Sequence, residues 1–181
     1  MRTKGDPTMT HEIDILRDAF ERIRDTVSST VDGLSEADLT FRPDGTGNSI
    51  AWLVWHLTRV QDSHIAEAAG TGTDQLWTGA GWADRFALAL PSDATGYGMT
   101  SDEVSLVRGI TFEQLTGYLT AVHDRTVEYL STLGDGDLDR IVDTRWDPPV
   151  TLAARLVSVI SDDLQHAGQA GYVAGLAKNR A

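Results

Sequence analysis

The sequence predicts an all-α protein, a four-helix bundle with a loop-rich insertion after the second helix. Apolar residues recur at spacings of three and four along four long segments, which is the pattern of amphipathic helices. Several of these segments begin with a residue that caps helices. No segment has the alternating pattern of a convincing strand. Such helices bury their apolar faces by packing against one another, which gives a bundle.

The first helix is expected directly after a tail. Residues 1–9 mix charge, Gly and Pro without periodicity and are predicted to be flexible, and Thr10 can cap the helix that follows. Residues 10–181 are predicted to form one domain, because the length suits one core and nothing in the middle reads as a linker. The apolar face of the first helix comprises Ile13, Leu16, Phe20, Ile23, Val27, Val31 and Leu34.

A second helix is predicted over residues 49–69, after a turn in which Ser35 and Asp38 resemble a capping box. Its first half is apolar around most of its circumference, so this helix should lie centrally. Residues 70–98 are rich in Gly, Thr and aromatic side chains, with room for only a short helix around residues 82–88. Long insertions in compact domains are often lids or binding loops, so we expect this one to contribute to a site.

Capping residues also mark the later helices. The pairs Thr100 with Glu103 and Thr111 with Gln114 form capping boxes that predict a short helix and then the long third helix. A connection with two consecutive prolines follows, where regular structure should stop until Thr151 caps the fourth helix.

The composition excludes several classes of function. Lys and Arg total 15 against 27 Asp and Glu, so a net charge of −12 should repel nucleic-acid phosphates and anionic membranes. The absence of cysteine excludes disulfides and any nucleophile or metal ligand that is a protein thiol. The longest apolar stretch, residues 50–55, is too short to span a bilayer, and the N-terminus lacks the apolar core of a signal peptide. We therefore expect a cytoplasmic protein without nucleic-acid or membrane partners.

Three ionisable residues are predicted to face the bundle interior. His56 shares a helix face with Trp52, and Asp162 and His166 lie one turn apart on the fourth helix. Two imidazoles and a carboxylate suit a divalent metal, zinc first and nickel or iron as alternatives, with a coordination position left for water or substrate. Two other interpretations stay open from the residues alone. His56 can be a core histidine with one hydrogen bond, and Asp162 with His166 can be an internal ion pair.

The other histidines are less promising. His64 lies eight residues after His56, rotated by roughly 80° on an ideal helix, so we expect it near the site at best. His11 is expected to be exposed and His123 to be structural.

The chain resembles the DinB-like superfamily, and within it actinobacterial members grouped with mycothiol-dependent maleylpyruvate isomerase and the bacillithiol transferases. The resemblance rests on WHLTRVQDSH, on RWDPPVTLAARLVSVISDDLQHAGQAGYVAGL and on four helices with an insertion after the second. It implies an up-down-down-up bundle, frequently a homodimer, with a divalent metal held by His56, Asp162 and His166. Relatives more often have His or Glu where this chain has Asp162, and neighbouring Asp163 is the alternative ligand.

The resemblance also implies a reaction. In these relatives the metal binds a low-molecular-weight thiol, stabilises its thiolate and presents it to an electrophile. A thiol is nucleophilic as the thiolate, and a protein without Cys must take its sulfur from a small molecule. We therefore expect a metal-dependent thiol S-transferase that uses mycothiol to attack a small electrophile. A non-enzymatic binder of a metal or small molecule, and a bundle that works through its dimer surface, are the alternatives.

Further site residues are expected around the metal. Arg59 and Gln169 lie about one turn from His56 and His166, where they can orient a ligand or the substrate, although for Arg59 a surface ion pair with Asp62 is an equal alternative. The aromatic residues expected to wall the electrophile pocket are Trp77, Trp82 and Phe86.

Overall fold

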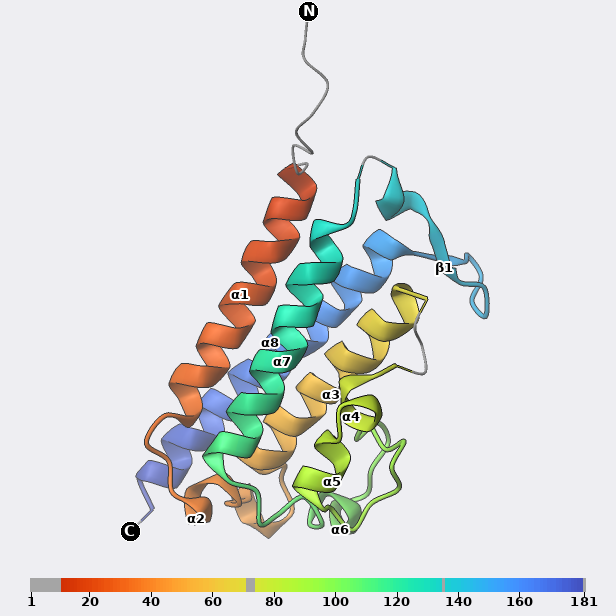
Figure 1. Cartoon of the computed structure of the whole chain (residues 1–181). Helices are drawn as coiled ribbons and strands as arrows, with labels where there is room; N and C mark the ends of the chain where they lie inside the picture. The colour runs from red at the N-terminus through yellow and green to blue at the C-terminus, as the bar shows by residue number, and fades with distance from the viewer. Residues whose placement is uncertain (1–10, 71–73, 135, 181) are drawn as a thin grey trace, which may run out of the picture.

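The computed structural model of the protein describes residues 11–70, 74–134 and 136–180. The predicted tail and its capping Thr10 lie outside these residues. The all-α bundle is confirmed, and Figure 1 shows its four long helices: α1 (His11–Val31), α3 (Ile50–Ala68), α7 (Phe112–Ser131) and α8 (Leu152–Lys178).

The up-down-down-up order is also confirmed. In Figure 1, α1 and α8 run in one direction while α3 and α7 run in the other. Helix α8 packs against α1 and α3, and so does α7, so that α3 and α8 are antiparallel neighbours. Since α3 and α7 are parallel, the chain has to return along the bundle between them, and the insertion makes this return.

The predicted helix starts are confirmed by capping hydrogen bonds. The Ser49 side chain accepts from the backbone N–H of Trp52 at the start of α3, and Thr151 caps α8 in the same way. Thr111 and Gln114 form the expected capping box at the start of α7. These side chains supply acceptors to backbone N–H groups that lack an intrahelical partner. Short elements fill the connections: α2 (Glu36–Leu39), η1 (Pro43–Gly45), α4 (Leu76–Gly79), α5 (Trp82–Phe86), α6 (Ser101–Val104) and η2 (Asp137–Asp139).

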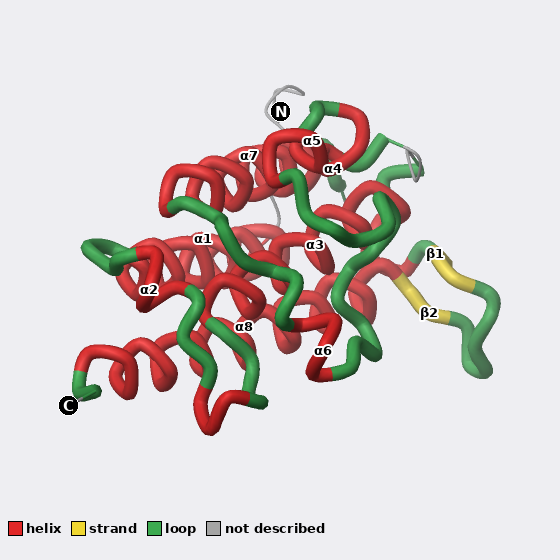
Figure 2. Tube along the Cα trace, turned by 90° about the horizontal axis from the view of Figure 1, so that it is seen from below, coloured by secondary structure: helices red, strands yellow, loops and turns green. Residues whose placement is uncertain are grey.

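The central position predicted for the second helix is correct. Every residue from 50 to 59 is buried. The insertion lies beside this helix, with α4 in contact with α3 and α5 in contact with α7 (Figures 1 and 2). One end of the central helix is therefore covered on all sides by the rest of the chain.

A short β-hairpin corrects the expectation of a chain without strands. Strands β1 (Ile141–Asp143) and β2 (Val150–Thr151) pair antiparallel directly before α8 (Figure 2). Strands of two or three residues are too short to give an alternating pattern in the sequence, which is why they were not expected.

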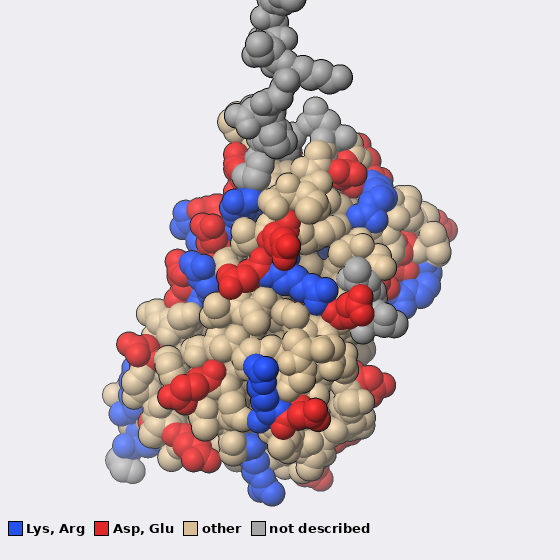
Figure 3. Space-filling view, viewed as in Figure 1, with Lys and Arg blue, Asp and Glu red and all other residues tan. Residues whose placement is uncertain are grey.

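Charged side chains of both signs are mixed on the surface. On the face shown in Figure 3, acidic and basic side chains of the described residues lie interspersed rather than in separate patches. No helix among the described residues is long and apolar enough to cross a membrane.

Candidate metal centre

The antiparallel pair α3 and α8 brings together the three residues that the sequence singles out. His56 comes from the buried half of α3, and Asp162 and His166 come from successive turns of α8. One ligand atom of each residue lies within 4.8 Å of the others. Atoms this close can converge on a single ion, so the residues form a possible metal-binding triad.

Each imidazole of the triad is oriented by a hydrogen bond at its outer nitrogen. His56 Nδ1–H donates to the carbonyl oxygen of Thr95 at 2.6 Å, and His166 Nδ1–H donates to Gln169 Oε1 at 2.9 Å. Because these oxygens can only accept, the hydrogen of each neutral ring is on Nδ1 and the lone pair is on Nε2. A partner of this kind on the far nitrogen is typical of histidines that bind metals.

The carboxylate of Asp162 is left without adequate partners. Its Oδ2 is buried and accepts no hydrogen bond from the described residues, and its Oδ1 lies 3.7 Å from His166 Nε2. That distance is too long for a hydrogen bond, so an Asp-His ion pair does not satisfy the group. A buried carboxylate oxygen without a donor is costly, and a cation between the three residues would remove the cost.

Asp163 is not part of the triad. Its side chain is fully buried and both oxygens lack hydrogen-bond partners among the described residues. Burial, and then the neighbouring Asp162 charge, raise the pKa of this carboxyl well above its usual range, so it is held neutral in the core. Of the two adjacent acids, Asp162 is the one placed to bind a metal.

His56 is enclosed by an aromatic ring and by the insertion. The Trp52 ring stacks on the imidazole with centroids 4.6 Å apart, and Gly96 approaches from the insertion. A Cβ on Gly96 would lie 2.5 Å from His56 Nδ1, and its φ of +99° is one that residues with side chains rarely adopt. Burial lowers the pKa of His56, and the hydrogen bond to Thr95 offsets part of this effect. Because the net shift is downward, the lone pair of the ring is available for a metal at neutral pH.

A cavity of about 520 Å³ lies along the groove between α3 and α8. His56 and Asp162 line one end of it, and His64 and Arg155 line the other. Two aromatic residues on its lining, Tyr97 and Trp146, are 92% and 66% exposed. The expectation that His64 lies near the site is therefore fulfilled. Arg155 is a residue of the cavity that was not predicted, although the sequence contains a sign of it. It precedes Asp162 by seven residues, about two helical turns, so the two side chains lie on the same face of the helix.

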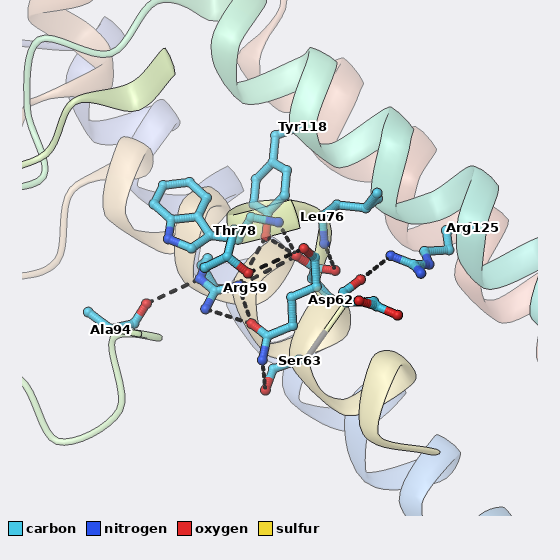
Figure 4. A network of polar contacts seen from close by, with 11 residues as sticks. Arg59, Asp62, Ser63, Leu76, Thr78, Ala94, Tyr118 and Arg125 are labelled. Atoms are coloured by element: carbon cyan, nitrogen blue, oxygen red, sulfur yellow. Dashed lines mark hydrogen bonds and ion pairs between the residues drawn. The ribbon is translucent and has the colours of Figure 1, made fainter. Parts of the chain in front are cut away.

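Arg59 does not line this cavity, which corrects its expected place in the site. Its guanidinium is 1% exposed and bonds to Asp62, Gln75 and Tyr118 in a buried network (Figure 4). The alternative of a surface ion pair with Asp62 is wrong for the same reason, since both side chains are 1% exposed at an N–O distance of 3.5 Å.

The network of Arg59 nevertheless supports His56 from outside. Arg59 Nε–H donates to the carbonyl oxygen of Ala94 at 3.1 Å (Figure 4). The next residue, Thr95, accepts the hydrogen bond of His56. Asp62 holds the start of α4 by accepting the backbone N–H groups of Leu76 and Trp77 at 2.9 and 2.8 Å. These bonds attach the insertion to α3 at two points.

The three aromatic residues expected to wall the pocket lie elsewhere, which is a second correction. Trp77, Trp82 and Phe86 pack around the ring of Tyr118 on α7, and the Trp82 and Tyr118 centroids are 5.5 Å apart. None of them lines the cavity beside the triad. Large aromatic rings stabilise a fold by burial. Asp62 fixes the start of α4, which carries Trp77, and Trp82 and Phe86 are on α5, which contacts α7.

Two other histidines and Gln169 lie where expected. His11 is exposed. His123 is buried on α7, where its Nε2 accepts from the guanidinium of Arg24 at 3.1 Å. Gln169 orients His166 through the hydrogen bond described above, which is the positioning role that its spacing predicts.

Comparisons with known proteins agree with this architecture. A family model described as the DinB superfamily matches residues 19–170. A solved structure described as the conserved protein of locus from Enterococcus faecalis is 30% identical, with a TM-score of 0.84 over 92% of this chain and 97% of that chain. Its description states no activity, and no curated protein matches the chain. Because the family model covers most of the sequence, this chain belongs to the DinB superfamily.

Proposed function

We propose that the protein is a metal-dependent thiol S-transferase. It binds a divalent cation through His56, Asp162 and His166 and activates a low-molecular-weight thiol for attack on a small electrophile. The observation that carries the proposal is unused coordinating capacity. Within the described part of the chain, both imidazoles use their outer nitrogen in a hydrogen bond and their inner nitrogen in none, and a buried Asp162 oxygen lacks a donor. His56 and Asp162 line a cavity of about 520 Å³.

The donor atoms fit the proposed cation. Two imidazole nitrogens and one carboxylate oxygen suit zinc, with nickel or iron as alternatives, and three protein ligands leave a position free toward the cavity. A divalent cation bound there would lower the pKa of a thiol and hold it as the thiolate.

The chain's own residues would then orient and protect the reacting groups. Thr95 and Gln169 fix the two imidazoles, and Trp52 with Gly96 closes one side of His56 against water. The chain has no Cys, so the nucleophilic sulfur must come from a co-substrate. Mycothiol is the first thiol to test, because the chain resembles mycothiol-dependent members of the superfamily.

A homodimer is part of the proposal. Helix α8 exposes Val157, Leu164 and Tyr172 at 59%, 47% and 70% of their surface, spaced by about two turns each. Exposed apolar residues in such a row suit contact with a second copy. The parent protein should sediment as a dimer and Leu164→Asp as a monomer, and a monomeric parent would overturn this part.

The metal centre is tested by elemental analysis and zinc titration of purified protein. The parent should bind about one ion per chain, and Asp162→Asn and His166→Ala should lose it while remaining helical by circular dichroism. Asp163→Asn is the matched control, because it makes the same change at the adjacent acid outside the triad, and it should keep the metal. A parent that binds no zinc, nickel or iron would overturn the proposal.

The reaction is tested separately with zinc-loaded protein, a thiol and monochlorobimane. Sulfur should bond to the carbon that carries chlorine, chloride should leave, and the thiol proton should pass to solvent, giving a fluorescent thioether. His166→Ala should abolish this product. Full metal occupancy without thiol consumption, across mycothiol and several electrophiles, would leave a metal-binding protein and exclude the transferase.

A further inference from the structure

The cavity beside the triad has two ends that differ in hydrogen-bonding character. Its lining runs from His56 to His64 on α3 and from Asp162 back to Arg155 on α8, and because the two helices are antiparallel neighbours these residues lie opposite one another. At one end, His56 and Asp162 present lone pairs, which bind cations. At the other end are His64 and Arg155.

At the second end, the polar groups that are not used in hydrogen bonds between His64, Arg155 and Asp143 are N–H donors. Arg155 Nη1 lies 3.0 Å from His64 Nδ1, and because a guanidinium can only donate, Nδ1 accepts and the ring hydrogen is on Nε2. Burial, and then the Arg155 charge, lower the pKa of His64, so the ring is neutral at pH 7. One further guanidinium N–H of Arg155 donates to Asp143 Oδ2 at 2.8 Å. These two bonds use two of its five N–H groups, and His64 keeps its Nε2–H.

Asp143 does not neutralise this end, because it is shared between two arginines. It accepts three hydrogen bonds from Arg145, from the backbone N–H and Nε at 2.9 Å and from Nη2 at 2.8 Å. These bonds hold the pKa of Asp143 well below its usual range, so one permanent carboxylate faces two guanidinium groups. Glu67 pairs with Arg145 at 3.0 Å and also lies 3.7 Å from His64 Nδ1, but it does not line the cavity. Arg155 therefore keeps its positive charge and has guanidinium N–H groups that these hydrogen bonds do not use.

We propose that His64 and Arg155 form a subsite for a carboxylate, or a similar anion, carried by one of the two co-substrates. The inference rests on the proposed function, since it takes the triad as the place of reaction. Arg155 precedes Asp162 by seven residues and His64 follows His56 by eight. At a rise of 1.5 Å per residue, the anion binds roughly 10 to 12 Å from the metal.

The cavity lining between the triad and the anion subsite indicates the chemical character of the linker that connects the reacting group of the ligand to its carboxylate. Val60 and Val159 lie between the two ends on the cavity lining, together with Ser63 and Ser158, and the exposed rings of Tyr97 and Trp146 also lie on it. The valines and the rings suit a largely apolar linker, and the rings can cover it when the ligand is bound. The class of ligand is an amphiphilic acid with its reacting group at the far end from its carboxylate.

The first arm of the test measures binding to cobalt-loaded protein, followed by the sulfur-to-cobalt absorption band. The probes are 8-mercaptooctanoate and 8-mercapto-1-octanol, which differ only in the terminal charge, and the short acid 3-mercaptopropionate with 3-mercapto-1-propanol. The long acid should bind at least about tenfold more tightly than the long alcohol, because the anion gains charge-assisted hydrogen bonds. The short acid should gain no advantage over its alcohol.

Arg155→Gln should abolish the preference for the long acid, and Arg22→Gln should keep it. Arg22 is the matched control, because it is an exposed arginine of α1 whose partner is Asp18. The acid and alcohol comparison on the parent stands even if Arg155→Gln does not fold. Equal affinities of the two long probes would overturn the subsite alone, whereas failure to bind cobalt would overturn the proposed function and the subsite with it.

The second arm identifies which co-substrate carries the anion. Turnover of zinc-loaded protein is compared between 8-bromooctanoate and its methyl ester with a neutral thiol, and then between the long acidic and neutral thiols with monochlorobimane. A preference of about tenfold for the acid in kcat/KM in the first comparison assigns the subsite to the electrophile, and in the second to the thiol. No preference in either comparison would overturn a role for the subsite in the reaction.

Discussion

Two polar clusters include residues of α3 that are only three positions apart, His56 in the triad and Arg59 in the buried network, and the clusters differ in how their polar atoms are bonded. In the network of Arg59, Asp62 and Tyr118, the side chains are 1% to 2% exposed and bond to one another, with Asp62 accepting from four donors. In the triad, the hydrogen bonds occupy the outer atoms of the rings, and the atoms that face one another make no hydrogen bonds with the described residues, the Asp162 and His166 pair being 3.7 Å apart. The more deeply buried cluster is the structural one, so burial of charge does not by itself identify a functional site. Unused coordinating capacity beside a cavity does.

The two clusters are nevertheless connected. Arg59 holds Ala94, and the adjacent Thr95 holds His56, so the satisfied cluster fixes the segment that orients the unsatisfied one. Changes in the first cluster should act mainly on stability, and changes in the second mainly on metal binding.

The largest expected effect is on the satisfied cluster. Asp62→Ala should lower the free energy of unfolding by about 3 to 5 kcal/mol, because it leaves the buried Arg59 charge and two backbone N–H groups of α4 without their acceptor. Urea unfolding followed by circular dichroism measures it. Asp18→Ala, at an exposed ion pair of α1, should leave the free energy of unfolding almost unchanged. Similar losses of unfolding free energy in both variants would show that the buried network stabilises the fold no more than an exposed ion pair does.

Metal should stabilise the unsatisfied cluster. At a free zinc concentration 100 times the dissociation constant, the parent should gain about 2.7 kcal/mol of unfolding free energy, because the ion binds the folded chain. His166→Ala should gain almost nothing. Without metal, the two proteins should differ little, because the hydrogen bond that His166 makes within the described part of the chain is to the exposed side chain of Gln169. A large loss in the metal-free variant would instead make the triad structural.

The connection between the clusters is tested at Gly96. Gly96→Ala places a Cβ 2.5 Å from His56 Nδ1, so the ring has to move and zinc affinity should fall by about 10-fold to 100-fold. Gly98→Ala is the matched control, since its φ of +71° imposes similar backbone strain but its Cβ would meet nothing within 4 Å. Isothermal titration of both variants gives the comparison, and equal zinc affinities would show that the insertion does not position His56.

The smallest expected effect concerns the second orienting bond. Gln169→Leu removes the acceptor of His166 Nδ1–H and should lower zinc affinity by about 10-fold. Gln165→Leu, one turn earlier on α8, removes an amide whose one partner among the residues that the structure describes is Ser161, and it should leave the affinity unchanged. Equal effects of the two substitutions would mean that the His166 ring is held by packing alone.

The sequence by itself determined the helices and most of the triad. Capping residues and apolar spacing act over one or two turns, so Ser49, Thr111 and Thr151 mark helix starts without knowledge of the fold. The spacing of Asp162 and His166 fixes a shared face in the same way, and the buried context of His56 directs it inward. These features depend on contacts between residues close in sequence, which a linear pattern records.

The tertiary structure alone decided what each side chain meets. Arg59 is three residues after His56, and this rotation of about 60° short of a full turn directs it to the insertion and α7 instead of α8. The choice between Asp162 and Asp163, and the pairing of His64 with Arg155, depend on how α3 packs against α8. Such contacts join residues about 90 to 110 positions apart, and the sequence gives no local signal for them.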